Sequence, residues 1–224
     1  MPAPVPAPAV AEQIFGERLP MAQRYAELLA TDGVERGLIG PHEAARIWDR
    51  HLLNCAVLGE LVPLESRIVD VGSGAGLPGM ALACRRPDLQ VDLVESLTRR
   101  VTFLRDTAAT LGLAEQVRVV HGRAEDREVR GSVGGAGWVT ARAVAPLERL
   151  VGWCLPVLKP GGKLLAMKGA QAEAEMQAHR AAIGRLGGDE VSIMTCGNGI
   201  VDPPVNVVVV RRGLRRAPSA KGSR

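Results

Sequence analysis

The amino-acid sequence predicts a doubly wound α/β fold, and three observations support this expectation. From residue 67 onward, short apolar runs alternate with longer amphipathic stretches, as strands and helices do in a mostly parallel sheet. The first apolar run ends in a glycine-rich turn, the place where such sheets bind ligands. The last two apolar runs are joined by a loop too short for a helix, so they form an antiparallel end. We therefore expect a seven-stranded, mostly parallel sheet whose last strand is antiparallel.

The composition fits one such domain with a short extension. The chain has 224 residues, and 46% of them are hydrophobic, enough for a sizeable core. Aromatic residues account for only 3%, which argues against recognition of nucleic acid mainly by base stacking. The net charge of +4 comes from the C-terminus, where six basic residues occur without an acid: Arg211, Arg212, Arg215, Arg216, Lys221 and Arg224. Such a tail either meets the phosphates of a nucleic acid or solubilises a flexible end.

The cysteines and the first residues indicate the compartment. The four cysteines form no C-x-x-C pair, so neither zinc nor a disulfide framework is indicated. No run of about 18 consecutive apolar residues occurs, so we expect no membrane span. Residues 1–11 form a Pro/Ala-rich arm, which lacks the basic and apolar blocks of a signal peptide. We expect a cytoplasmic monomer without a metal.

The N-terminal part reads as helical. We expect the arm at residues 1–11 to be disordered and residues 12–62 to form a helical extension, because apolar residues recur there at helical spacing. Thr31-Asp32-Gly33 interrupts this pattern, and Pro41 fits the first turn of the next helix. Residues 63–212 form the α/β domain, and residues 213–224 form a flexible basic tail.

Within the α/β domain, periodicity and turn residues predict each element. Strands are expected at residues 67–71, 90–94, 117–120, 138–141, 163–167, 191–195 and 205–210. Helices are expected at residues 77–86, 97–111, 146–158 and 170–186. Pro87 stops the first of these helices and Gly112 closes the second, whereas the turn at residues 159–162 introduces the fifth strand.

The turn after the first strand predicts a nucleoside site. It reads Asp70-Val71-Gly72-Ser73-Gly74-Ala75-Gly76-Leu77-Pro78-Gly79, and Glu95 ends the second strand. Glycine allows a positive φ and a close approach of the backbone to a ligand. A carboxylate at the end of the next strand can accept hydrogen bonds from both ribose hydroxyls of a nucleoside. The plainer interpretation is a glycine-rich connection with no ligand.

The same turn contains a literal G-x-G-x-x-G match, which leaves two cofactors open. This motif is the dinucleotide fingerprint and would indicate NAD. Asp70, however, would repel a pyrophosphate and attract the amino group and sulfonium of S-adenosylmethionine. Pro78 has no N–H to donate to a phosphate. Both features favour S-adenosylmethionine.

In the segment after the third strand, the backbone of Ala124 and Glu125 is placed to line the adenine pocket of that cofactor. The plainer interpretation of Glu125 and Asp126 is a pair of acids at a helix N-terminus.

Five segments, taken in order, resemble one known family. They are the turn at residues 70–79, Glu95-Ser96-Leu97 with Arg100-Val101 and Phe103-Leu104, Arg123-Ala124-Glu125, Thr140-Ala141-Arg142-Ala143, and Lys168-Gly169. Together they are similar to the bacterial small-subunit ribosomal RNA guanine-N7 methyltransferase G family, formerly called glucose-inhibited division protein B. The resemblance runs from about Ile47 to Lys168, which is most of the catalytic domain.

The resemblance implies a class I, Rossmann-like methyltransferase fold that uses S-adenosylmethionine. Its target would be N7 of a single guanine of 16S rRNA, usually numbered 527, in naked RNA or in the small ribosomal subunit. Residues implied to contact the cofactor are Gly72, Leu77, Ala124, Glu125 and Arg142, with Glu95 at the ribose; to these we add Asp70 and Gly74 from the turn itself. The resemblance also places Arg50, His51 and Lys168 at the border of the site.

The chemistry of this target needs cations more than a general base. Guanine N7 carries an exposed lone pair and no proton to remove, so orientation and a desolvated pocket are sufficient. Asp202-Pro203-Pro204 is followed by valine, so we interpret it as a hairpin loop rather than an amine-methylation motif. We name Arg142 and Lys168 as candidate catalytic residues, and as candidate substrate contacts Arg50, His51, Arg123 and Lys168.

Plainer structural interpretations accompany these assignments. Arg142 could form an ion pair with Glu95, Glu125 or Asp126. His51 could be a half-buried helix residue, and Arg99, Arg100 and Arg105 could form a solvated helix face. Three other functions also stay open: a methyltransferase of this fold acting on a small molecule or protein, an NAD-dependent oxidoreductase, and a non-catalytic RNA-binding module.

Overall fold

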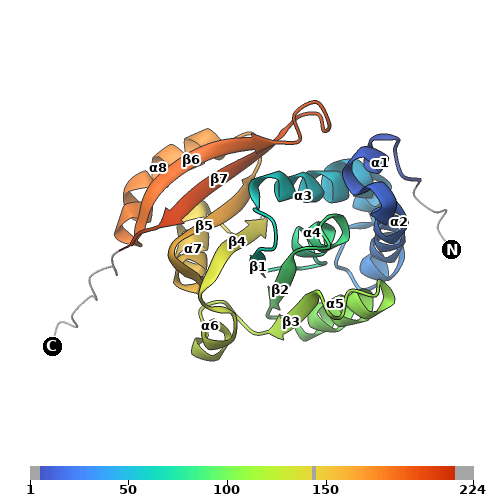
Figure 1. Ribbon diagram of the computed structural model, residues 1–224, viewed down its shortest axis with the longest axis horizontal. Coiled ribbons are helices and arrows are strands. Elements are labelled where there is room, and N and C mark those ends of the chain that lie inside the picture. Colours follow the sequence, from blue (N-terminus) through green and yellow to red (C-terminus); the bar gives the residue numbers. More distant parts are fainter. Residues whose placement is uncertain (1–5, 143–144, 215–224) are drawn as a thin grey trace.

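The computed structural model describes residues 6–142 and 145–214. Its centre is a seven-stranded sheet of order β3-β2-β1-β4-β5-β7-β6 (Figure 1). The strands are β1 (Arg67–Val71), β2 (Gln90–Glu95), β3 (Val117–His121), β4 (Ala136–Arg142), β5 (Leu158–Lys168), β6 (Gly188–Cys196) and β7 (Val205–Arg212). Strands β1 to β5 are parallel, and β7 runs antiparallel to both of its neighbours. The predicted doubly wound fold with an antiparallel last strand is confirmed.

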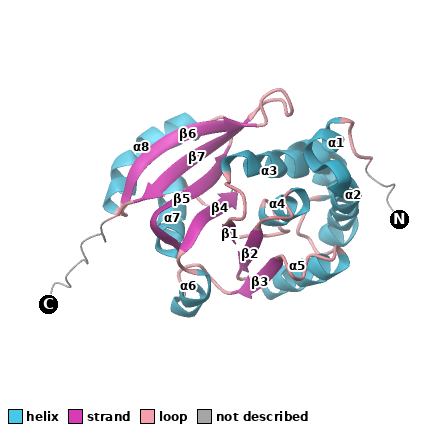
Figure 2. Cartoon of the chain, viewed as in Figure 1, coloured by secondary structure: helices cyan, strands magenta, loops and turns pink. Residues whose placement is uncertain are grey.

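The helices surround this sheet (Figure 2). They are α1 (Val10–Phe15), α2 (Leu19–Leu28), α3 (Leu53–Ala56), α4 (Gly79–Arg85), α5 (Thr98–Thr110), α6 (Arg127–Val133), α7 (Leu147–Cys154) and α8 (Ala172–Arg185). Short 3-10 and π-type turns complete the N-terminal part, among them Pro41–Arg46 and Ile47–Leu52. The sequence did not predict α6, because this seven-residue helix buries only Val129 and Val133 and therefore shows little apolar periodicity.

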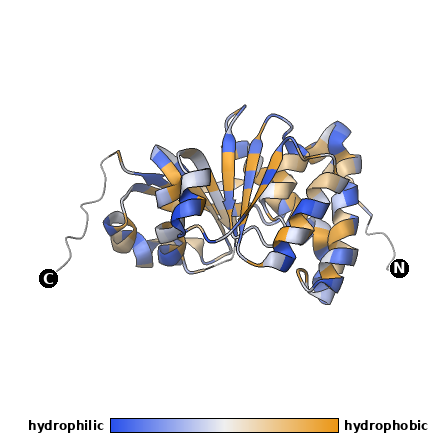
Figure 3. Ribbon diagram, turned by 90° about the horizontal axis from the view of Figure 1, so that it is seen from below, coloured by the Kyte–Doolittle hydropathy of each residue, from blue (hydrophilic) through white to orange (hydrophobic). Residues whose placement is uncertain are grey.

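Two cores lie on opposite faces of the sheet. Successive strand residues point to opposite faces, so Ile68 belongs to one core and its neighbour Val69 to the other. The first core joins the N-terminal helices to α4 and α5, and the second joins α6, α7 and α8. Figure 3 shows the apolar strands in the middle with helices on both sides. The sheet is therefore covered on both faces, as parallel sheets require.

Several expected boundaries differ from the structure, two of them by part of an element or more. Helix α1 begins at Val10 and Ala11 is buried, so ordered chain begins inside the expected arm. Strand β5 begins at Leu158 and includes the segment expected to be a turn before it. The first five residues of the arm, residues 215–224 of the expected basic tail and Ala143 of the family motif lie outside the described residues. In the part of the chain that is described, no helix has the length and apolar character needed to cross a membrane.

Candidate active site

The carboxyl ends of β1 and β4 mark the point where the strand order reverses. Strand β1 pairs with β2 on one side and with β4 on the other. Helices leave these two strands toward opposite faces, so a crevice forms at their ends, and ligands of doubly wound sheets bind there. Two cavities open on either side of this point, one at the ends of β1, β2 and β3 and one beyond β4 and β5.

The turn after β1 depends on glycine at several positions. Gly72, Gly74 and Gly76 have φ values of 73°, 58° and 98°, a region that side-chain-bearing residues rarely adopt. A Cβ on Gly76 would lie 2.7 Å from the hydroxyl oxygen of Tyr25, and one on Gly79 would lie 2.9 Å from Cβ of Asp70. The glycines of this motif are therefore required both by the backbone conformation of the turn and by its close packing.

Glu95 holds this turn through its carboxylate. The side chain is only 3% exposed. One oxygen, Oε2, accepts the N–H of Gly74 at 2.9 Å, and Oε1 accepts the N–H groups of Ser96 and Leu97 at 2.8 and 2.9 Å. Arg100 lies 3.5 Å from Oε2. The interpretation of Arg100 as part of a solvated face is wrong, because its guanidinium pairs with Glu95 and its Nε is buried without a described partner.

Asp70 lies beneath the turn and is fully buried. Its Oδ2 accepts the N–H of Gly79 at 3.0 Å, whereas Oδ1 has no hydrogen-bond partner among the described residues. Burial raises the pKa of this carboxyl group to about 7, although the hydrogen bond from Gly79 and the charge of Arg142 oppose the shift. A buried carboxylate oxygen without a partner, next to a turn of glycines, fits a ligand that carries positive charge.

The first cavity has a volume of about 390 Å³ and combines several predicted cofactor contacts. Its lining consists of Val71, Gly72, Val94, Glu95, Ser96, Arg100, Gly122, Arg123, Ala124, Glu125 and Trp153. Four predicted cofactor residues therefore share one cavity: Gly72, Glu95, Ala124 and Glu125. Asp70, Gly74, Leu77 and Arg142 do not line it; Gly74 donates a hydrogen bond to Glu95, Leu77 is packed in the first core, and Arg142 lines the second cavity.

Two residues of this cavity differ from the sequence assignments. Arg123, predicted to contact substrate, lies here with the cofactor residues. Trp153 comes from α7 and was missed, because a tryptophan in an amphipathic helix gives no signal beyond that of a core residue. Ser96 and Arg100 belong to the motif segment around Glu95, so the sequence did contain a signal for them.

The second cavity has a volume of about 540 Å³ and is lined by most of the basic residues predicted to bind substrate. Arg50, His51, Arg142 and Lys168 all line it. Glu43, Asn54, Pro203, Pro204 and Asn206 also line it but were not assigned a role from the sequence. The loop containing Asp202-Pro203-Pro204 does join the last two strands as expected, and the structure in addition places its prolines at this cavity.

Arg142 ends β4 and reaches across to the N-terminal extension. Its Nη2 donates a hydrogen bond to Nδ1 of His51 at 2.8 Å, and its Nη1 donates to the carbonyl of Arg50 at 3.4 Å. No ion pair in the described structure joins Arg142 to the acids at positions 95, 125 or 126. The ion-pair interpretation of Arg142 is therefore wrong, because the extension supplies neutral acceptors instead.

Lys168 has a paired ammonium group. Its Nζ donates to the carbonyl of Ala145 at 3.0 Å and to Oε1 of Glu175 at 2.9 Å, and the side chain is only 10% exposed. The same oxygen of Glu175 accepts the N–H of Leu147 at 2.7 Å. Lys168 thus links the start of α7 to α8 at the rim of the second cavity. Its positive charge is balanced by the carboxylate of Glu175.

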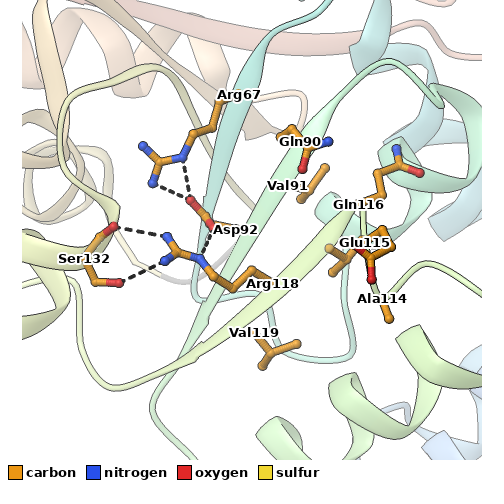
Figure 4. A pocket seen from close by; sticks show the side chains of 11 residues that line it. Arg67, Gln90, Val91, Asp92, Ala114, Glu115, Gln116, Arg118, Val119 and Ser132 are labelled. Atoms are coloured by element: carbon orange, nitrogen blue, oxygen red, sulfur yellow. Dashed lines mark hydrogen bonds and ion pairs between the residues drawn. The ribbon is translucent and has the colours of Figure 1, made fainter.

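A larger cavity, of about 780 Å³, lies at the opposite end of the sheet (Figure 4). Arg67 and Arg118 both bind the carboxylate of Asp92, through their Nε atoms at 2.8 and 2.6 Å. Arg118 also donates to the side chain and the carbonyl of Ser132. These donors are occupied, and the cavity lies at the amino ends of the strands rather than at the ends where ligands bind. We therefore interpret this cluster of side chains as structural.

Comparisons with solved structures support the fold. A predicted O-methyltransferase from Agrobacterium tumefaciens superposes with a TM-score of 0.57 at 22% identity, covering 72% of this chain and 82% of that one. An S-adenosylmethionine-dependent methyltransferase in its apo form gives a TM-score of 0.58 at 20% identity, covering 84% and 62%. At these identities the likeness concerns the class I methyltransferase fold alone.

Comparisons of sequence are more specific. A model of the family rRNA small subunit methyltransferase G matches residues 18–203. A ribosomal RNA small subunit methyltransferase G from Salinispora arenicola is 53% identical over 241 residues, covering 100% of this chain and 98% of the relative. A protein of the same name from Mycobacterium marinum is 52% identical, covering 95% and 92%. The chain therefore belongs to the rRNA small subunit methyltransferase G family.

Proposed function

We propose that this protein methylates N7 of a single guanine in small-subunit ribosomal RNA. Its family membership makes it an S-adenosylmethionine-dependent methyltransferase of that RNA. The position on the base and the use of one guanine are the proposed part. The observation that carries the proposal is the pair of cavities at the strand-order reversal, one around Glu95 and one around Arg142.

The first cavity fits S-adenosylmethionine, whose sulfonium supplies an activated methyl group when it is bound. Glu95 would accept a ribose hydroxyl, while Ala124 and Glu125 would border the adenine. Three backbone N–H groups donate to the Glu95 carboxylate, and the guanidinium of Arg100 forms an ion pair with its Oε2. Arg100 makes the longest of these contacts, at 3.5 Å, so we propose that it yields its place to the ribose.

The second cavity would hold the guanine. Arg142 donates N–H groups to His51 and Arg50 and also lies against the thiol of Cys55, and because a guanidinium has five N–H groups, donors remain for a guanine O6 or a phosphate. In the second cavity, the carboxylate of Glu43 pairs with Arg50 and contacts His51, and His51 accepts a hydrogen bond from Arg142. This arrangement suits a ring nitrogen that has no proton to remove, because no free base is required.

The roles of the remaining predicted residues follow from their positions. We propose that Arg50, which is exposed at the rim, meets RNA phosphates, and that Lys168 supports the cavity wall rather than the chemistry. We propose a cytoplasmic monomer, since its substrate is ribosomal RNA and residues of one chain line both cavities.

Mapping of methylated nucleotides tests this function. Small-subunit RNA from cells lacking the protein should lose one N7-methylguanine, and purified protein should restore it on undermethylated RNA or on assembled subunits. Comparing these two acceptors also identifies the natural substrate. A methyl group recovered on an exocyclic amine, or on many guanines, would contradict the proposal.

A further inference from the structure

Three side chains from distant parts of the chain form a continuous row at the second cavity. Glu43 lies in the turn Pro41–Arg46, His51 in the π-type turn Ile47–Leu52, and Arg142 at the end of β4. Nε2 of His51 lies 3.0 Å from Oε2 of Glu43, and its Nδ1 lies 2.8 Å from Nη2 of Arg142. Single-turn π segments occur often at functional sites, and this one presents both His51 and the Arg50 carbonyl to Arg142.

The hydrogen-bond directions in this row determine where the imidazole proton lies. A guanidinium is always protonated and only donates, so Nδ1 of His51 must present its lone pair to Arg142. The proton of the neutral ring then lies on Nε2 and is donated to the carboxylate of Glu43. A doubly protonated imidazole would point an N–H at a guanidinium, so the contact with Arg142 would be lost.

We propose that His51 is a positioning residue that aims the guanidinium of Arg142 into the substrate cavity, with Glu43 holding the imidazole in its Nε2–H form. This inference rests on the proposed function, in which Arg142 holds the target guanine. His51 itself is only 10% exposed, and both of its nitrogens are engaged, so its action runs through Arg142.

The surroundings of His51 keep it neutral at the pH of the cytoplasm. Its titratable neighbours are Glu43, Arg50 on its own turn and Arg142 on β4. Burial lowers the pKa of His51 and Arg142 lowers it further, whereas Glu43 raises it. The folded state therefore disfavours the protonated imidazole of His51. Its hydrogen bond with Arg142 is fully formed above the ordinary histidine pKa of about 6.5 and is lost as the pH falls through the lower pKa of the folded state.

Variants at position 51 distinguish a role of His51 in positioning Arg142 from a role in packing alone. His51→Ala should lower kcat on undermethylated small-subunit RNA by about 100-fold, because a misplaced guanidinium no longer holds the base. Binding of S-adenosylhomocysteine should stay within about twofold of the wild-type value. His51→Asn places an amide oxygen near the position of Nδ1, so it should recover most of the activity and should lack the acid limb of the pH profile.

The matched control is His179→Asn, because His179 also pairs with a glutamate, Glu148, at 3.4 Å but lies on α8 and lines neither cavity. It should leave kcat and the pH profile unchanged. Glu43→Gln removes a charge that favours the imidazolium, so the acid limb should move to lower pH. Equal activity of His51→Ala and wild-type protein, or an unchanged acid limb in His51→Asn, would overturn the inference.

A measurement that does not use activity keeps this inference separate from the proposed function. The imidazole ¹⁵N spectrum of the folded protein should show His51 as the Nε2–H tautomer, and Arg142→Ala should raise its pKa. If wild-type protein methylated no guanine, the proposed function would fail, and this spectrum would still decide the arrangement. A protonated or Nδ1–H imidazole at pH 7.5 would refute it.

Discussion

At the scale of one residue, Asp70 couples the stability of the fold to pH. Its side chain is fully buried, one of its oxygens lacks a described partner, and burial raises its pKa to about 7. Because the pKa is raised, proton binding by Asp70 stabilises the folded state. This contribution to the free energy of unfolding is fully present below the ordinary pKa of 3.8 and is lost as the pH rises through 7. At higher pH the folded protein holds a desolvated charge, which a cationic ligand would offset.

Replacing Asp70 by asparagine should separate these two effects. The amide oxygen can still accept the N–H of Gly79, so the free energy of unfolding at pH 8 should rise by roughly 1–3 kcal/mol. Affinity for S-adenosylmethionine should fall roughly tenfold, by about 1.4 kcal/mol, because the anion is gone. Urea unfolding at pH 5 and pH 8, together with calorimetry, provides both values. A less stable variant at pH 8 would mean that Oδ1 has a partner in solution.

Glu95→Gln should weaken both the turn and the cofactor site. Both carboxylate oxygens accept backbone N–H groups, so an amide must turn its NH₂ toward one of these donors. We expect a loss of about 1–3 kcal/mol in stability and at least a tenfold loss of affinity for S-adenosylhomocysteine. Thermal melting and calorimetry check this, with Glu128→Gln on the exposed side of α6 as the control. Unchanged affinity would remove Glu95 from the proposed ribose site.

At the scale of the element, the glycines of the β1–α4 turn have different tasks. A Cβ on Gly74 would find only the carbonyl oxygen of Gly72, at 3.9 Å, whereas one on Gly76 would collide with Tyr25 and Met80. Tyr25 is buried and donates a hydrogen bond to the carbonyl of Ala75, so it has no room to move away. The space around Gly74 means that its positive φ is the main requirement for glycine there, whereas Gly76 is also required for packing against the extension.

A matched pair of alanine variants distinguishes these tasks. Gly74→Ala should lower the free energy of unfolding by about 1–2 kcal/mol, the strain of its positive φ, and should strongly reduce cofactor binding. Gly76→Ala should lower it by about 3 kcal/mol or more, because overpacking adds to the same strain. Chemical unfolding gives both values. If the two variants lost equal stability, the close contact with Tyr25 would not matter.

At the scale of the whole molecule, the N-terminal extension and the methyltransferase domain share one core. Tyr25, Leu29 and Ile47 belong to the same cluster as Leu93 and Phe103. Arg18 adds hydrogen bonds from its Nε and Nη2 to the carbonyls of Cys84 and Ala83, at 2.7 and 3.1 Å. We propose that residues 12–62 are an integral part of the active enzyme, since they also supply Glu43 and His51 to the second cavity.

A shared core predicts a single cooperative unfolding transition. In a variant carrying Trp138→Phe and Trp153→Phe, the remaining Trp48 reports on the extension, while far-ultraviolet circular dichroism reports on the whole chain. The two signals should change at the same temperature, as for one cooperative unit. An earlier change in Trp48 fluorescence would show that the extension unfolds on its own.

Much of the fold and part of the site could be predicted from local signals. Strand β1 lies where the apolar run predicted it, and β2 differs by one residue at its end. Helix α6 was missed because two buried valines carry too little periodicity. Arg100 was misinterpreted because an arginine on a helix reads as solvated unless its partner on another element is known.

The sequence by itself determined the sheet, the glycine turn and the acid after the second strand, because strand period, glycine conformation and chain order are local properties. Only the tertiary structure decided which side chains share a cavity. It placed Trp153 and Arg123 at the first cavity, paired Lys168 with Glu175, and joined Glu43 through His51 to Arg142. These contacts depend on how helices pack across the sheet edge, and residues 91 positions apart meet there only because the folded core brings the extension to the end of β4.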